Sequence, residues 1–152
     1  TQVAGRAGRG VRPGEVLVQT YYPDHYAIRC AAEQNFDKFY EQEMRFRRLL
    51  HYPPFVALAN VVVRERRLEA AVRAARTMQE FFERRRSASL RALGPAPAPR
   101  ARLKKDYRFQ FLLKSSERRA LQETLRAAVA HARAKEIPAG VLLVDVDPIS
   151  LV

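Results

Sequence analysis

The sequence has few cysteines and histidines, and it has no long apolar run. It contains one cysteine, Cys30, so no disulfide can form within the chain. We interpret this thiol as a small buried hydrophobic side chain. The three histidines, His25, His51 and His131, stand apart without the spacing of metal ligands. No apolar run approaches the roughly 20 residues of a membrane-spanning helix.

A complete catalytic motif is also missing. The sequence has no phosphate-binding G-x-x-x-x-G-K-[ST] run and no pair of acids arranged for Mg²⁺. It offers no nucleophile set and no acid–base pair. Asp145 and Asp147 alternate with valines, which places both on one face of a strand, where they can pair with basic neighbours. An enzyme complete within this sequence is therefore the least favoured hypothesis.

Positive charge is abundant and concentrated in one segment. The formal net charge is +12, and residues 84–119 hold twelve Lys or Arg against two acids, a balance of +10 in 36 residues. Such a concentration creates a field that attracts polyanions. It favours nucleic acid or an acidic peptide as the partner over a merely soluble arginine-rich surface.

The first third of the chain predicts a short strand followed by one long helix. Residues 15–20 are apolar and follow a Pro-Gly turn, which indicates a strand. Residues 26–50 place aromatic and leucine side chains at helical spacing, and the Pro53-Pro54 pair ends that helix. We interpret the stripe as a packing surface; it comprises Phe36, Phe39, Tyr40, Phe46, Leu49 and Leu50.

The remainder predicts four strands and two helices in the order strand–helix–strand–strand–helix–strand. Strands are expected at residues 55–63, 87–93, 106–114 and 140–147, with an amphipathic helix at about 68–86. A second helix is expected from Ser116, acting as N-cap, to shortly before Pro138. The prolines of residues 94–99 predict an extended loop, because each lacks an N–H. This order is the split βαβ, or ferredoxin-like, arrangement of an α+β domain.

The opening residues, TQVAGRAGRG, form a turn suited to phosphate. Backbone N–H groups of a glycine-rich turn can approach an anion, and two arginines add planar charged donors. The segment resembles motif VI of superfamily-two helicases, Q-x-x-G-R-x-G-R, with Gln2, Gly5, Arg6, Gly8 and Arg9 in its positions.

Five further segments narrow this resemblance. They are residues 13–28, 39–55 (FYEQEMRFRRLLHYPPF), 94–99 (GPAPAP), 107–114 (YRFQFLLK) and 144–148 (VDVDP). Together with the opening turn, and in this order, they resemble the C-terminal end of the primosomal protein N′ family, the replication-restart DNA helicases PriA. The resemblance covers essentially the whole chain.

The resemblance implies a division of the chain and a parent activity. Residues 1–20 would be the end of the second RecA-like helicase lobe, residues 21–54 a helical connector, and residues 55–152 a C-terminal domain similar in fold to ribosomal protein S10. The parent would be an ATP-dependent 3′-to-5′ DNA helicase that acts at abandoned replication forks and starts primosome assembly. We expect this fragment alone to be catalytically inactive.

The same resemblance implies cofactors and a location. Gln2, Arg6 and Arg9 would serve the ATP site, with ATP and Mg²⁺ as cofactors of the parent helicase. The family carries zinc-binding cysteines elsewhere, so zinc is expected in the parent and not in this fragment. The expected location is the bacterial cytoplasm, in association with the nucleoid.

Two surfaces are predicted to bind partners. Arg100, Arg102, Lys104, Lys105 and Arg108 are expected to hold phosphates of forked or single-stranded DNA without reading sequence. The alternate residues Tyr107, Phe109, Phe111 and Leu113 are expected to face the core.

The second surface lies at the start of the last helix. Arg118 and Gln122 share a helix face at the positively polarised N-terminus, which suits an acidic peptide. By resemblance, this peptide is the acidic tail of single-stranded-DNA-binding protein, and other primosome proteins are further partners. The alternative hypothesis is a free-standing ferredoxin-like module that binds RNA or the ribosome and has no ATPase activity.

Overall fold

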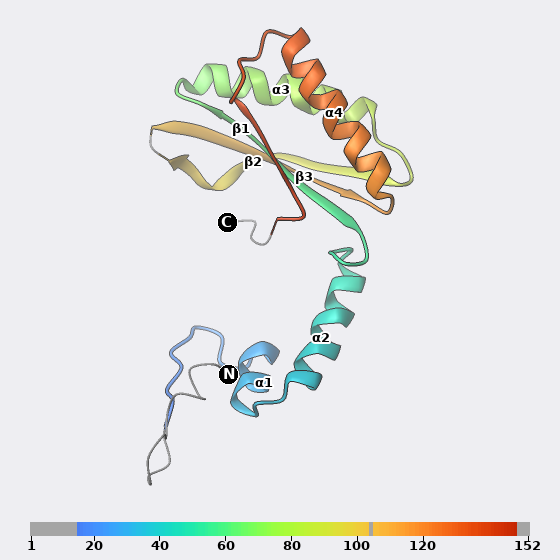
Figure 1. Ribbon diagram of the computed structural model, residues 1–152. Coiled ribbons are helices and arrows are strands. Elements are labelled where there is room, and N and C mark those ends of the chain that lie inside the picture. Colours follow the sequence, from blue (N-terminus) through green and yellow to red (C-terminus); the bar gives the residue numbers. More distant parts are fainter. Residues whose placement is uncertain (1–14, 104, 149–152) are drawn as a thin grey trace. The chain divides into compact units, whose positions relative to one another are not determined.

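The computed structural model describes residues 15–103 and 105–148, apart from the side chains of Arg100, Arg102 and Leu103. The chain divides into two compact units, Thr1–Leu49 and Leu50–Val152. The described elements of the first unit are helices, and the second unit is an α+β domain (Figure 1).

The first unit contains two helices where one was predicted. Helix α1 spans Tyr26–Ala32 and helix α2 spans Phe36–Leu49. The backbone between them turns at Gln34, which has a φ of 51°, and the Asn35 side chain then accepts a hydrogen bond from the Lys38 N–H at 2.9 Å. A positive φ interrupts a helix and an Asn oxygen caps the next one, so the single long helix was a wrong prediction.

Aromatic stacking joins α1 to α2. The Tyr26 ring stacks on Phe46 at 5.1 Å and on Phe39 at 6.1 Å between ring centroids. The Tyr26 hydroxyl donates a hydrogen bond to Glu43, which raises the pKa of Tyr26 to about 12 and lowers the pKa of Glu43. Cys30 is buried, as predicted. Phe39 and Phe46 of the predicted packing stripe thus stack within this unit. Five of the six stripe residues are nevertheless exposed, namely Phe36, Tyr40, Phe46, Leu49 and Leu50, so the stripe is a packing surface only in part.

Residues 15–20 do not form the predicted strand. They are exposed and in irregular conformation. A β-strand exists through backbone pairing with a neighbouring strand, and the sheet that the structure describes does not include these residues. Local apolar content alone was an insufficient signal.

The second unit has the predicted order of strands and helices. Its elements are β1 (Ala57–Glu65), α3 (Leu68–Arg84), β2 (Leu90–Leu103), β3 (Asp106–Ser115), α4 (Arg118–Ala134) and β4 (Leu142–Val146). The sheet order is β2-β3-β1-β4, and every described pairing is antiparallel. Since β3 runs antiparallel to both β1 and β2, those two strands run parallel with β3 inserted between them. This topology is compatible with a split βαβ domain.

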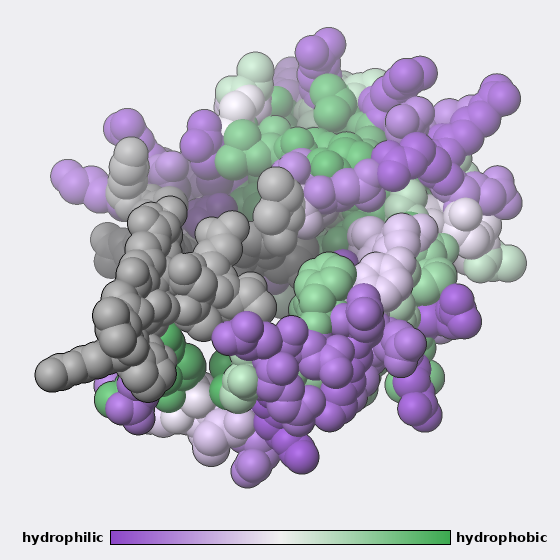
Figure 2. Space-filling model, turned by 60° about the horizontal axis from the view of Figure 1, so that its bottom comes forward, coloured by the Kyte–Doolittle hydropathy of each residue, from purple (hydrophilic) through white to green (hydrophobic). Residues whose placement is uncertain are grey.

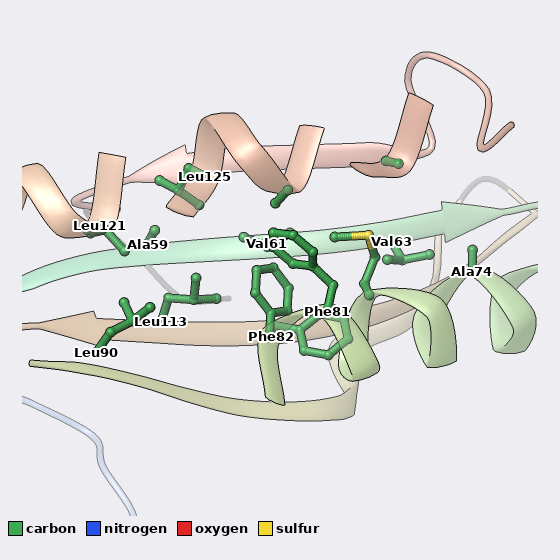
Figure 3. Close-up of a cluster of buried hydrophobic side chains, with 14 of the residues drawn as sticks. Ala59, Val61, Val63, Ala74, Phe81, Phe82, Leu90, Leu113, Leu121 and Leu125 are labelled. Atoms are coloured by element: carbon green, nitrogen blue, oxygen red, sulfur yellow. The ribbon is translucent and has the colours of Figure 1, made fainter. Parts of the chain in front are cut away.

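One face of the sheet packs against both helices (Figure 1). Side chains from β1 and β3 meet those of α3 and α4 in a single core (Figure 3). The ring centroids of Phe82 and Phe111 lie 5.2 Å apart in this core. Phe111 is 1% exposed and Leu113 is fully buried, which confirms that their face of β3 is the core face. Tyr107 and Phe109, nearer the start of the strand, are half-buried.

The proline-rich segment is part of a strand and not the predicted loop. Strand β2 continues through Gly94–Pro99, with shifts in register between Leu93 and Ala96 and between Pro97 and Arg102. The strand tolerates these prolines because β2 lies at the edge of the sheet. At an edge, a residue without an N–H loses no backbone hydrogen bond to a strand on the outer side. The rule that proline avoids central strands holds, but the sequence did not reveal that β2 is an edge strand.

The start of α4 also differs from the prediction. The N-cap is Glu117, whose side chain makes no capping bond, and not Ser116. Ser115 instead stabilises this turn, since its hydroxyl donates to the Glu117 carbonyl at 2.8 Å and accepts from the Glu117 N–H at 3.1 Å. A buried serine one residue earlier therefore has the role that the sequence assigned to Ser116.

Candidate nucleic-acid and partner-binding surface

The face of the sheet turned away from the helices carries positive charge. Alternation along β3 places Arg108, Gln110, Leu112 and Lys114 on the opposite face from the core residues Phe111 and Leu113. We call this the open face. In the view of Figure 2, hydrophilic side chains cover much of the surface, with separate apolar areas between them.

The predicted DNA-binding residues lie around the β2–β3 hairpin. Register pairs Arg102 with Tyr107 and Leu103 with Asp106, so β2 and β3 form a hairpin whose connection includes Lys105. Lys105 is exposed with a φ of 74°, as a tight turn requires. Lys104 lies outside the described residues, and only the backbone of Arg100 and Arg102 is described. The hairpin therefore brings the backbone of Arg102, Lys105 and Arg108 together at one end of the sheet.

Arg108 has a cationic neighbour that the sequence did not reveal. It lies directly opposite Arg64 of β1 in the antiparallel register. Arg64 is held in place by a hydrogen bond from its Nε to the Gly140 carbonyl at 2.9 Å. Like charges directly opposite each other on one sheet face are unfavourable unless an anion lies between or beside them. Arg64 therefore joins Arg108 as a candidate phosphate contact.

Arg118, predicted to hold an acidic tail, already has an internal partner. Its guanidinium lies 2.6 Å from a carboxylate oxygen of Asp147, and its side chain remains 60% exposed. This ion pair confirms that Asp147 pairs with a basic neighbour, and Asp147 also accepts a hydrogen bond from the Leu58 N–H at 3.2 Å. The prediction that Asp145 and Asp147 share one strand face was wrong, because β4 ends at Val146 and Asp147 has a φ of 51°. Gln122 is exposed one turn further along α4. A carboxylate of a bound peptide would therefore either bind Arg118 together with Asp147 or displace Asp147 from Arg118.

The remaining predicted site residues stand as follows. Gln2, Arg6 and Arg9 lie outside the described residues. His25 caps α1 by accepting from the Ala27 N–H, and His131 stacks on Phe81 at 4.8 Å. Within the described part of the chain, no three His, Cys, Asp or Glu side chains gather as a metal site would need. None of the described helices is long and apolar enough to cross a membrane.

Comparison with known proteins identifies relatives over nearly the whole chain. The Replication restart protein PriA of Bacillus subtilis (strain 168) is 35% identical over 147 residues, 97% of this chain. PriA of Treponema pallidum (strain Nichols) is 37% identical over 151 residues, 99% of the chain. PriA of Haemophilus influenzae is 34% identical over 147 residues, 97% of the chain. The chain spans only about a fifth of the length of these relatives, at 18%, 22% and 20%.

A family model adds the position of the domain. The model described as Primosomal protein N C-terminal domain matches residues 48–149, which include the whole four-stranded sheet and both helices that cover it. The match spans two thirds of the chain and agrees with the order of elements observed. The chain therefore belongs to the primosomal protein N C-terminal domain family.

Proposed function

We propose that this chain is the C-terminal part of an ATP-dependent 3′-to-5′ DNA helicase that recognises abandoned replication forks and starts primosome assembly. Residues 1–20 would complete a RecA-like helicase lobe, with Gln2, Arg6 and Arg9 at the phosphates of ATP and Mg²⁺ bound in the remainder of the protein. The relatives are named replication restart proteins, which supports this role.

Within this protein, the sheet domain holds DNA. The observation that supports this assignment most directly is the pair of arginines, Arg64 and Arg108, placed opposite each other on the open face next to the basic hairpin. Arginine side chains neutralise phosphates and release counterions, which gives affinity without sequence readout. Such binding suits a protein that recognises the shape of a fork.

Fluorescence anisotropy tests this assignment. Labelled forked, duplex and single-stranded DNA are titrated at two or more salt concentrations with the wild type and with a Lys105→Ala/Arg108→Ala variant. Each phosphate contact removed lowers the salt dependence, the slope of log K against log[salt], by about 1, so the double variant should lose about 2 on duplex DNA.

A matched variant separates local contacts from total charge. Arg76 on α3 and Arg126 on α4 are exposed on the helical side of the sheet, and Arg76→Gln/Arg126→Gln removes the same two charges there. Affinity for DNA should stay close to the wild type in this variant. Equal losses in both variants, or no DNA binding by the wild type at low salt, would refute the assignment. Tighter binding to structured RNA than to any DNA would favour the alternative, an RNA-binding module.

The start of α4 would dock the acidic tail of single-stranded-DNA-binding protein. Arg118 and Gln122 supply a charged fork and an amide one helical turn apart. Because Arg118 already forms an ion pair with Asp147 at 2.6 Å, the acidic tail must compete with the Asp147 carboxylate. An acidic peptide should therefore bind weakly to the wild type and not at all to Arg118→Ala/Gln122→Ala, as measured by calorimetry.

A further inference from the structure

A second positively charged site lies on the open face, at the far end of β3 from the hairpin. A pocket of about 290 Å³ is lined there by residues that include Leu50, His51, Arg91, Lys114 and Ser116. All residues that line the pocket belong to the second unit, Leu50–Val152, and none of them is Asp or Glu. The pocket is distinct from the hairpin residues and from Arg118 and Gln122.

Arg91 and Lys114 are cross-strand neighbours in the lining of this pocket. They are directly opposite in the β2–β3 register. Their sequence neighbours Leu90 and Leu113 are buried in the core, so both cations point to the open face. Side chains directly opposite each other on antiparallel strands are about 5 Å apart at Cβ, and like charges there destabilise the pair.

The fold holds the Lys114 ammonium in place despite this repulsion. Its Nζ donates to the Leu50 carbonyl at 3.0 Å and lies 3.8 Å from the centre of the Tyr52 ring. Burial lowers the pKa of Lys114, and the charge of Arg91 lowers it further. Among the described residues, no ion pair includes Arg91 or Lys114. The pocket therefore presents two cations, of which Lys114 is held in place, and no described carboxylate forms an ion pair with either of them.

The donors of the pocket match the acceptors of a phosphate group. A guanidinium supplies a planar fork, an ammonium supplies a point charge, and the Ser116 hydroxyl can donate a further hydrogen bond. A phosphate offers several oxygens to such a set, and its negative charge would remove the repulsion between Arg91 and Lys114.

We propose that the Arg91–Lys114 pocket binds a backbone phosphate of a nucleic-acid strand that lies along β3. The proposal rests on the DNA-binding function proposed above. Lys114 lies six residues beyond Arg108 on the same face, which is about 20 Å along a strand. One strand of a duplex rises about 3.4 Å per nucleotide along the helix axis, and an extended single strand rises more, so this distance spans at most about six nucleotides. The two cation pairs would contact phosphates at the two ends of this interval.

The test uses single-stranded (dT)12, long enough to reach both pairs, with the wild type and an Arg91→Gln/Lys114→Gln variant. Glutamine keeps a polar side chain beside Leu50 and removes the charge. We expect affinity to fall about tenfold at low salt, and the salt dependence of log K to fall by about 1.4, the value for two contacts to a single strand. The melting temperature should change little, because the loss of the Lys114 contacts with Leu50 and Tyr52 is offset by the removal of two repelling charges.

The control is the Arg76→Gln/Arg126→Gln variant, which should bind (dT)12 as the wild type does. If Lys105→Ala/Arg108→Ala weakens binding and Arg91→Gln/Lys114→Gln does not, the pocket proposal fails while DNA binding by the hairpin stands. If the wild type binds no DNA at low salt, the proposed function fails as well. Inorganic phosphate that shifts the amide resonances of the pocket, together with unchanged (dT)12 affinity in the pocket variant, would assign the site to a free phosphate and overturn the proposal.

Discussion

Gly94 should be far less tolerant of a side chain than Gly140, although both have a positive φ. Gly94 has a φ of 114° and Gly140 a φ of 89°. A Cβ at position 94 would lie 2.6 Å from the Gln110 carbonyl oxygen and 3.2 Å from Phe111 Cα, whereas a Cβ at position 140 meets only an Arg64 guanidinium nitrogen at 3.9 Å. The two glycines therefore separate backbone strain from steric contact.

The expected magnitudes follow from these distances. Forcing alanine into a positive-φ conformation costs about 1–2 kcal/mol, partly offset by the reduced entropy of the unfolded chain. Gly140→Ala should therefore lose about 1 kcal/mol. Gly94→Ala adds a contact that β2 can relieve only by moving away from β3, and overpacking of this kind costs about 1–3 kcal/mol more. We expect a total loss of about 3 kcal/mol.

Urea unfolding followed by circular dichroism measures both variants against the wild type. A difference of about 2 kcal/mol corresponds to about 8–16 °C in melting temperature for a domain of this size. Equal losses in the two variants would refute the reasoning, because they would mean that β2 moves away from Gln110 without cost.

Three further predictions follow from individual contacts. Phe111→Ala should lower the free energy of unfolding by about 3–5 kcal/mol in urea titrations, because the ring is 1% exposed in the core. The pKa of Glu43 is lowered, chiefly by the hydrogen bond from Tyr26. The ionised Glu43 carboxylate therefore stabilises the helices above about pH 4.5, and this stabilisation is lost as the pH falls through the lowered pKa. Tyr26→Phe should weaken this loss of helicity at acid pH, as measured by circular dichroism. Asp147→Asn removes the internal partner of Arg118 and should raise the affinity for an acidic peptide in calorimetry, with a loss of stability of about 1 kcal/mol or less.

The order of elements in the sheet domain could be predicted because each element carries its own periodic signal. The alternation of β3 also identified Phe111 and Leu113 as core residues, and burial confirms it. The helix break before Asn35 was missed even though Asn is a good N-cap, because the aromatic spacing continues across it. The spacing of apolar residues therefore predicts that a helix or strand exists more reliably than it predicts the residue at which it ends.

Contacts between distant strands could not be predicted from the sequence. Arg64 and Arg108 are neighbours, as are Arg91 and Lys114, only because of the register of β3 with β1 and β2. A shift of one residue would have placed these side chains on opposite faces. The pairing of Arg118 with Asp147 likewise depends on tertiary packing, since it joins the start of α4 to the residue after β4, and it was not foreseen as a limit on tail binding.

The prolines of β2 explain why binding on this domain should occur through the open face and not through the sheet edge. An exposed edge strand offers unpaired N–H and C=O groups to any extended chain. Pro95, Pro97 and Pro99 remove three of those donors from β2, and the register shifts further interrupt the edge. Addition of a strand from another protein is thereby disfavoured at β2, while the cation pairs of the open face remain accessible.

Replacing all three prolines with alanine should leave the affinity for (dT)12 nearly unchanged but promote self-association of the protein, measurable by analytical ultracentrifugation. Loss of DNA affinity without self-association would contradict this division between edge and face.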